Sequence, residues 1–191
     1  VHLHNHSEYS LLDGLQKIKN MVEYVKSLGM KSIAITDHGY MYGTIKFYKA
    51  CKEAGIKPII GCEIYVAKRT LHDKEPQDKE YNHLILLAEN EIGYKNLMKI
   101  VSIANLEGYY YKPRTDLQLL EKYHEGLICL SACVNGYVSE PLMRNEDGLA
   151  EERAIKLSKI FGPNNFYFEL QRHIDVPPQE PVNQKLLKLS K

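Results

Sequence analysis

The sequence has little of what marks several common protein classes. Its formal net charge is only +1, so no overall basic field indicates a nucleic-acid binder, and any such contact needs a local patch. The longest apolar runs, such as residues 84–88, are far too short to cross a bilayer. No secretory signal opens the chain. We therefore expect a cytoplasmic protein without membrane association.

Cysteine is scarce, and the residues present are Cys51, Cys62, Cys129 and Cys133. They stand mostly alone inside apolar segments, and no second close pair completes the spacing of a zinc finger. A reduced protein without disulfides is the simplest interpretation. The sequence also lacks a serine triad, a P-loop and a dinucleotide fingerprint, which argues against the enzyme classes built on them.

The rest of the composition is that of an ordinary globular domain, with 44% hydrophobic and 26% charged residues. At 191 residues one core suffices, and nothing demands a second domain. Apolar periodicity predicts helices over residues 15–28, 41–54, 94–104, 149–161 and 182–189. Short apolar or β-branched runs predict strands over residues 32–36, 59–66, 84–88, 127–131 and 166–170. Residues 70–81 and 108–115 are expected to be loops.

This alternation of strands and helices predicts an α/β fold in which a parallel sheet has helices outside it. Right-handed crossovers leave either an open doubly wound sheet or a barrel. In both architectures, functional residues gather at the carboxyl ends of the strands. Polar residues that follow an apolar strand are therefore the first candidates for a site.

Three histidines, His2, His4 and His6, alternate at the N-terminus. On a strand they would share one face, and imidazoles aimed together are poor packing units and good metal ligands. The interleaved Leu and Asn argue against a tag remnant. Asp13 comes just before the first predicted helix, where a metal ligand and an N-terminal cap, in a capping box with Gln16, are equally open.

Two further strands carry polar groups beside a glycine. The first runs into Asp37 and His38, and an Asp-His-Gly turn after an apolar strand favours a site over a structural histidine. The second holds Glu63 shortly after Gly61, which allows a close backbone approach. A buried carboxylate needs a partner. A metal ion is the simplest partner, with Arg or Lys as the alternative.

By position alone, His83 is a histidine at the edge of the core and Cys133 is a buried thiol. His72 and His124 stand among charges and are expected in solvent, whereas the role of His173 stays open. Imidazole, carboxylate and thiolate together suit zinc, manganese or iron better than magnesium or calcium. Such a centre favours hydrolysis of phosphoesters.

Taken in order, residues 4–7, 10–14, 35–39 and 61–63 resemble the PHP (polymerase and histidinol phosphatase) family. Residues 2–14, 83–88, 93–97, 111–114 and 126–131 resemble more narrowly its version in the alpha subunit of bacterial DNA polymerase III. The resemblance implies a distorted (β/α)7 barrel with two or three Zn²⁺ or Mn²⁺ ions at its C-terminal rim. The ligands that it implies are His4, His6, Asp13, His38, Glu63, His83 and Cys133. Among these and their neighbours, we expect Asp13, Asp37 and His38 to serve catalysis.

The family pattern ends with an Asp-x-His pair on a later strand, and no such pair occurs before Lys191. We therefore expect residues 1–191 to be the N-terminal part of a PHP domain, with the barrel and the metal shell C-terminally incomplete. The implied activity is a metal-dependent phosphoesterase within a DNA-directed DNA polymerase, either as a 3′–5′ exonuclease or in pyrophosphate hydrolysis. DNA and other polymerase III holoenzyme subunits are the implied partners. The alternatives are an inert PHP domain that stabilises the polymerase and docks a proofreading subunit, or a stand-alone histidinol-phosphate phosphatase.

Residues 109–114 combine three tyrosines with Lys112 and Arg114. Aromatic rings beside fixed cations suit single-stranded nucleic acid, which they bind by stacking and phosphate contact. A partly packed surface loop is the alternative, and the sequence leaves the choice open.

Overall fold

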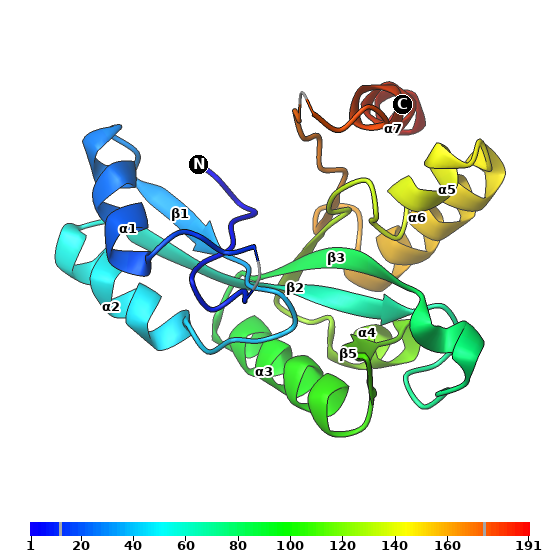
Figure 1. Cartoon of the computed structure of the whole chain (residues 1–191), viewed down its shortest axis with the longest axis horizontal. Helices are drawn as coiled ribbons and strands as arrows, with labels where there is room; N and C mark the ends of the chain where they lie inside the picture. The colour runs from blue at the N-terminus through cyan, green and yellow to red at the C-terminus, as the bar shows by residue number, and fades with distance from the viewer. Residues whose placement is uncertain (12, 174) are drawn as a thin grey trace.

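The computed structural model of the chain describes residues 1–11, 13–173 and 175–191. Its elements are α1 (Ile18–Ser27), β1 (Ser32–Ile35), α2 (Thr44–Ala54), β2 (Lys57–Ala67), the 3₁₀ helix η1 (Pro76–Lys79), β3 (Tyr81–Ala88), α3 (Glu91–Leu106), β4 (Tyr109–Tyr110), β5 (Lys112–Thr115), α4 (Leu117–Tyr123), β6 (Leu127–Leu130), α5 (Ser139–Met143), α6 (Asp147–Phe161), β7 (Phe166–Tyr167) and α7 (Gln179–Leu189). Figure 1 shows α1 and α2 at one end of the long strand β2, with α5, α6 and α7 toward the other side.

Seven strands form one sheet in the described part of the chain, with the order β4-β5-β2-β3-β6-β7 and with β1 paired to β2 outside this path. The long strand β2 is central, since β1 runs parallel to its residues 57–60 and β5 runs parallel to its residues 65 and 66. β3 is antiparallel to both β2 and β6, whereas β6 and β7 are parallel. This strand order does not return to its start, so the sheet is open among the described residues.

The mixed α/β class is as predicted, but the all-parallel sheet is wrong. Parallel neighbours need a long crossover, usually helical, whereas antiparallel neighbours do not. The connection from β2 to β3 contains only the short η1, and the chain returns beside β2 in the opposite direction. Residues 108–115, expected to be a loop, contain the hairpin β4–β5. The helices α4 and α5 were not predicted.

Apolar side chains form three buried clusters that hold the sheet between its helices. Leu84 and Leu86 of β3 belong to the largest cluster, which also contains residues of α3, α4, α6 and α7. Ile85 and Leu87 of the same strand belong to a smaller cluster with Leu130. Successive residues of a strand point to opposite faces. Both faces of β3 are therefore apolar, which explains why its sequence is a continuous hydrophobic run rather than an alternating one.

Glycines end the first two helices, as their positions predicted. Gly29 and Gly55 follow α1 and α2 with φ values of +70° and +72°, a conformation that glycine adopts without a Cβ penalty. At the other end, α1 begins at Ile18, and no side chain caps it from the N-cap residue Lys17. The alternative that Asp13 caps this helix is therefore wrong. Every helix in the described ranges is too short or too polar to span a membrane.

Candidate metal centre

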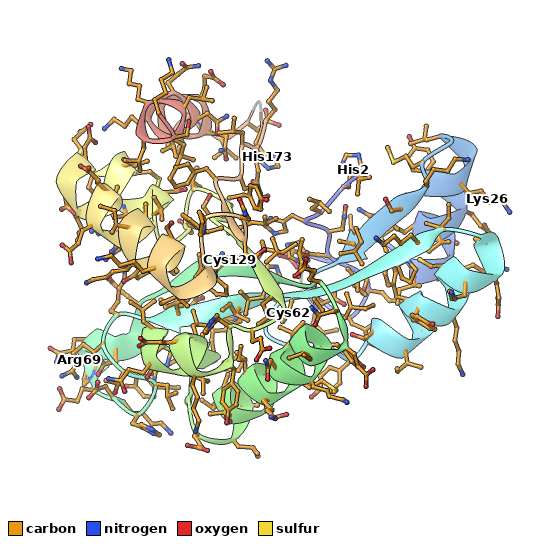
Figure 2. The ribbon with its side chains drawn as sticks, turned by 180° about the vertical axis from the view of Figure 1, so that it is seen from behind. His2, Lys26, Cys62, Arg69, Cys129 and His173 are labelled. Carbon is orange, nitrogen blue, oxygen red and sulfur yellow. The ribbon has the colours of Figure 1, made fainter. Side chains whose placement is uncertain are left out.

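The N-terminal residues run beside β1 without forming a regular strand. Carbonyl groups three residues apart, at positions 2 and 5, accept hydrogen bonds from the N–H groups of Ala34 and Thr36. The extra residue breaks the expected alternation of side chains. His2 consequently lies in solvent, as Figure 2 shows, whereas the Nε2 atoms of His4 and His6 lie 3.2 Å apart.

Glu63 on β2 lies at the middle of a ring of four histidines. The residue is only 1% exposed. Its Oε2 atom lies 2.6 Å from Nε2 of His4 and 3.3 Å from Nε2 of His6. Its Oε1 atom lies 2.8 Å from Nδ1 of His83 and 3.1 Å from Nδ1 of His38. One buried carboxylate thus joins side chains from the N-terminal segment, from β3 and from the turn after β1.

Two more of the expected ligands lie in contact with this ring. The carboxylate of Asp13 is 2.8 Å from Nε2 of His38. The thiol of Cys133 is 3.6 Å from Nδ1 of His83. The structure therefore brings together all seven residues that the family resemblance implied as ligands.

Glu169 also belongs to this cluster, although the sequence analysis did not select it. It follows β7, and its Oε1 atom lies 2.8 Å from Nδ1 of His4. The side-chain amide of Gln171 donates to the same oxygen at 2.6 Å. A carboxylate on the second nitrogen of a metal-binding histidine fixes its tautomer and its orientation. The available signal was a carboxylate near the carboxyl end of the predicted strand 166–170.

These donors fit a divalent metal ion. Ligand atoms of His4, His6 and Glu63 lie within 4.8 Å of one another. Nδ1 of His6 and Oε2 of Glu169 are buried without a hydrogen-bond partner among the described residues. Imidazole nitrogens as close as those of His4 and His6 compete for one proton, and a cation would satisfy both. Nitrogen and carboxylate ligands of this kind suit zinc, manganese and iron.

The electrostatics of the ring point the same way. Burial opposes the charged form of Glu63, yet hydrogen bonds from His38 and His4 outweigh it and hold the pKa of Glu63 well below its usual value. Burial also opposes the charged form of His4, but hydrogen bonds to Glu169 and Glu63 raise its pKa to about 10. For His83, hydrogen bonds to Cys133 and Glu63 overcome burial and raise the pKa to about 9. A metal ion that binds here replaces protons.

Asp37, expected among the catalytic groups, holds the N-terminal loop instead. It is 2% exposed, and its Oδ1 atom accepts hydrogen bonds from the N–H of Ser7 at 2.6 Å and from Oγ of Ser10 at 2.8 Å. Its Oδ2 atom accepts from Oγ of Ser7 at 2.8 Å. Both oxygens are therefore engaged by the loop that joins His6 to Asp13. Asp37 therefore positions this loop, and its expected part in catalysis stays a prediction.

Two glycines next to expected ligands allow close backbone approaches. Gly39, with φ +66°, would place a Cβ 2.7 Å from Cγ of Pro113 and 2.9 Å from Cε2 of Tyr65. A Cβ on Gly61 would lie 2.5 Å from the carbonyl oxygen of Leu86 on β3, which confirms the close approach predicted there. Larger residues would force apart the strands and turns that carry His38 and Glu63.

A cavity of about 770 Å³ opens beside the cluster. Asp13, His38 and His83 contribute to its wall, and so does Lys112. It is also lined by tyrosines, namely Tyr9, Tyr40, Tyr42, Tyr65, Tyr81, Tyr109 and Tyr111. Lys112 is half-buried, with its Nζ atom 5.5 Å from the centre of the Tyr65 ring. The expected ligands thus meet a polar, aromatic cavity.

Arg114 does not face this cavity, and the expectation that it contacts nucleic acid is wrong. The residue is 0% exposed. Its guanidinium donates to the backbone carbonyl groups of Gly108 at 3.2 Å, Asp78 at 2.9 Å and Asp73 at 2.7 Å. The contacts to Asp78 and Asp73 fasten β5 to the connection that precedes β3. A guanidinium used in this way cannot reach a nucleic acid in this fold.

The other histidines and most of the cysteines lie apart from the cluster. His72 and His173 are exposed, and His124 is half-buried. All four cysteines are free, and three of them are buried, whereas Cys133 is half-buried. Figure 2 labels two of these, Cys62 and Cys129, inside the fold.

A profile of the PHP domain family matches residues 2–173 of the chain. The chain belongs to the PHP domain family. The DNA polymerase III subunit alpha of Borreliella burgdorferi is 51% identical over 193 residues, which cover 100% of this chain and 17% of that protein. The subunit of the same name from Aquifex aeolicus is 46% identical over 198 residues, which cover 100% of this chain and 17% of that protein. The sequence-based recognition of this family is confirmed.

Among solved structures, a candidate metal-dependent phosphoesterase from Bifidobacterium adolescentis has a similar fold. The TM-score is 0.60 at 13% identity, over 98% of this PHP chain and 82% of that structure. At this identity the likeness concerns the fold alone. The PHP chain spans only 17% of the length of the two polymerase subunits it matches.

Proposed function

We propose that this PHP chain binds two or three Zn²⁺ or Mn²⁺ ions and hydrolyses phosphodiester bonds within a bacterial DNA-directed DNA polymerase. The observation that carries the proposal is the ring of four histidines around the buried Glu63, beside a cavity. Removal of 3′-terminal nucleotides, or hydrolysis of pyrophosphate, is the reaction that fits such a polymerase. The name of the relatives, DNA polymerase III subunit alpha, supports DNA and other holoenzyme subunits as partners. Our proposal includes a cytoplasmic location.

In this proposal the ions are held by His4, His6, Asp13, His38, Glu63, His83 and Cys133. Such ions lower the pKa of bound water to about 7 and stabilise the attacking and leaving oxygens of a phosphoester. Glu169 orients His4 through the 2.8 Å contact to Nδ1. Asp37 holds the loop that carries the N-terminal ligands.

Asp13 and His38 are the groups that can hold or move a proton at the cavity wall. The Asp13 side chain is 59% exposed, and its Oδ2 atom lies 2.8 Å from Nε2 of His38. The carboxylate holds the proton on Nε2 of His38, which leaves Nδ1, on the side of Glu63, free to bind a metal ion. Lys112, in the same wall, supplies a positive charge for a phosphate group.

The test combines metal analysis with two hydrolysis assays on the full-length protein. The double variant His4→Ala/His6→Ala is compared with His124→Ala, a histidine outside the cluster. We expect the double variant to lose bound metal and to hydrolyse an oligonucleotide and bis(p-nitrophenyl) phosphate at least about a hundredfold more slowly. The control should keep both. Full hydrolysis by a metal-free double variant would refute the proposal. A wild-type protein that binds metal but hydrolyses neither substrate would favour the inert, structural alternative.

We also propose that further βα units complete the barrel and contribute an Asp-x-His pair to the metal shell. A cavity of about 1000 Å³, lined by Leu3, Leu87, Leu130 and Leu170 among others, lies between the N-terminal segment and the residues after β7. Such an apolar surface suits another part of the same fold. A form extended by roughly two βα units should bind more metal per chain than residues 1–191 and hydrolyse diesters faster. Equal metal content and equal rates would contradict this proposal.

A further inference from the structure

We propose that the tyrosine-lined part of the cavity is a subsite for unpaired bases of single-stranded DNA. This inference rests on the proposed phosphodiesterase function, and it deepens that function by assigning the residues that hold the strand. It assigns no role to Arg114, which is buried. The aromatic side chains involved come from several separate segments of the chain.

The first observation is an aromatic pair at the cavity, of which Tyr42 is exposed and Tyr40 is half-buried. Tyr40 and Tyr42 follow the turn that carries His38, and their ring centroids lie 5.0 Å apart with 14° between the planes. Tyr42 is 70% exposed and still lines the cavity. A stacked aromatic pair with open surface offers a platform on which a base can continue the stack.

The second observation is the backbone of the β4–β5 hairpin. Tyr111 has φ +60° in the turn of this hairpin. A bulky residue in this conformation is strained, and such strain clusters at ligand-binding sites. The Tyr111 ring meets the Tyr110 ring edge to face, with centroids 4.8 Å apart, and the residue stays 59% exposed. Its ring lines the cavity, where a base can stack on it.

The third observation is the placement of charge. Lys79 has its Nζ atom 5.0 Å from the centre of the Tyr111 ring, and Lys112 has its Nζ atom 5.5 Å from that of Tyr65. Asp13 is the one acidic residue among the described residues that line this cavity, and it belongs to the metal cluster. Cations interleaved with aromatic faces match a strand whose phosphates alternate with bases. The volume of about 770 Å³ is within the usual range of ligand sites, about 300–1,000 Å³.

The experiment separates the subsite from the metal centre by using two substrates. The full-length protein is assayed with Mn²⁺ on a single-stranded oligodeoxynucleotide and on bis(p-nitrophenyl) phosphate, which has no base. The variants are Tyr42→Ala and Tyr111→Gly. Tyr24→Ala is the matched control, because Tyr24 is 66% exposed on α1 and does not line the cavity.

We expect each cavity variant to raise the KM for the oligonucleotide about tenfold, the usual effect of losing one stacking platform. The values of kcat and the rates on the small diester should stay unchanged, and so should both assays of the control. Tyr111→Gly should also keep or raise the melting temperature, because glycine adopts positive φ without strain. An unchanged oligonucleotide KM in both variants would overturn the subsite.

If the wild type hydrolyses neither substrate, the proposed function fails and the subsite is decided by binding. An oligonucleotide with 2-aminopurine at its 3′ end is titrated with the protein in EDTA, where stacking quenches the fluorescence. Quenching that is lost in Tyr42→Ala and Tyr111→Gly but kept in Tyr24→Ala supports the subsite. Quenching that all three variants keep overturns it.

Discussion

Two neighbouring strands each carry a buried charge, and the two charges have different partners. Arg114 of β5 is 0% exposed and donates to backbone carbonyl groups. Glu63 of β2 is 1% exposed and contacts imidazole rings instead. Those rings belong to side chains that are 11% to 23% exposed, so the ring reaches the surface.

The difference separates a structural charge from a functional one. Backbone carbonyl groups cannot change protonation, so the partners of Arg114 can only stabilise the fold. Imidazoles can exchange a proton for a metal ion, so the partners of Glu63 can bind a ligand. A buried charge alone therefore does not mark a site. The chemistry of its partners, and their access to a cavity, does.

The largest effect on stability is expected from Arg114→Met. This variant removes the guanidinium and leaves several buried carbonyl groups without a partner, so we expect a loss of about 3–5 kcal/mol in the free energy of unfolding. Urea unfolding measures it. Arg144→Met is the control, since Arg144 is 47% exposed and pairs with Glu146 and Glu140. Glu140 keeps Lys68 and Arg153 as partners in this variant, so about 1 kcal/mol or less is expected. Equal effects of the two substitutions would break the distinction drawn above.

Glu63→Gln should act mainly on metal binding and hydrolysis, whereas Arg114→Met acts on stability. The amide keeps the shape of the side chain but loses the charge that four histidines share, so bound metal should fall and diester hydrolysis should drop about a hundredfold or more. Unfolding of the metal-free protein should also become easier, because the imidazoles lose their buried counter-charge, so metal content and not unfolding separates this variant from Arg114→Met. Metal analysis, hydrolysis and urea unfolding in EDTA test the three expectations. A Glu63→Gln variant that loses stability but keeps its metal would assign Glu63 a structural role.

The sequence predicted the strands and helices near this cluster because local periodicity reports burial directly. It also placed polar residues at strand ends, and the family resemblance joined them into one ligand set. The antiparallel direction of β3 was not predicted, because a fully buried strand has the same apolar run in a parallel and in an antiparallel sheet. Glu169 was not predicted to join the site, because it lies 165 residues from its partner His4 and no local pattern encodes such a contact.

Arg114 shows the opposite error. A cation among tyrosines has the composition of a nucleic-acid-binding loop, and the neighbouring Lys112 does line the cavity. The two residues differ in burial, which depends on the distant carbonyl groups of the 70–80 connection. The contacts of Asp37 with the N-terminal loop were missed for a similar reason, because its three hydrogen bonds come from Ser7 and Ser10, on a segment nearly thirty residues away.

A smaller effect is expected from Glu169→Gln, which tests whether the cluster extends to β7. Glu169 contacts His4 on the nitrogen that does not face Glu63. Carboxylates in this position typically contribute 10–100-fold in metal affinity, so we expect a loss of about that size. Titration with Zn²⁺ against a chelator measures it. Glu107→Gln, a carboxylate at the end of α3, is the control, and equal affinities in both variants would remove Glu169 from the centre.

The smallest expected effect is a loss of stability in acid. It compares the metal cluster with the ion pair of Asp78 and Arg69. Asp78, whose backbone carbonyl accepts from Arg114, has its own carboxylate hydrogen-bonded to Arg69, and this bond outweighs burial and lowers the pKa of Asp78 to about 2. Because the folded pKa lies below the unfolded value of about 3.9, this stabilisation is complete at neutral pH. It is lost as the pH falls through about 2. The effect should be modest, since Arg69 is 44% exposed.

We therefore expect the free energy of unfolding of the wild type to decrease between about pH 4 and pH 2. Asp78→Asn should flatten that decrease, whereas Asp147→Asn, an exposed partner of Lys185, should leave it intact. Metal release should come at higher pH, because protons on His4 and His83 compete with the ion well before Asp78 is protonated. Urea unfolding and metal content are measured across the same pH series. If metal release and the decrease in stability occur at different pH values, the metal cluster and the Asp78–Arg69 pair are independent. If they coincide, the metal centre also stabilises the fold.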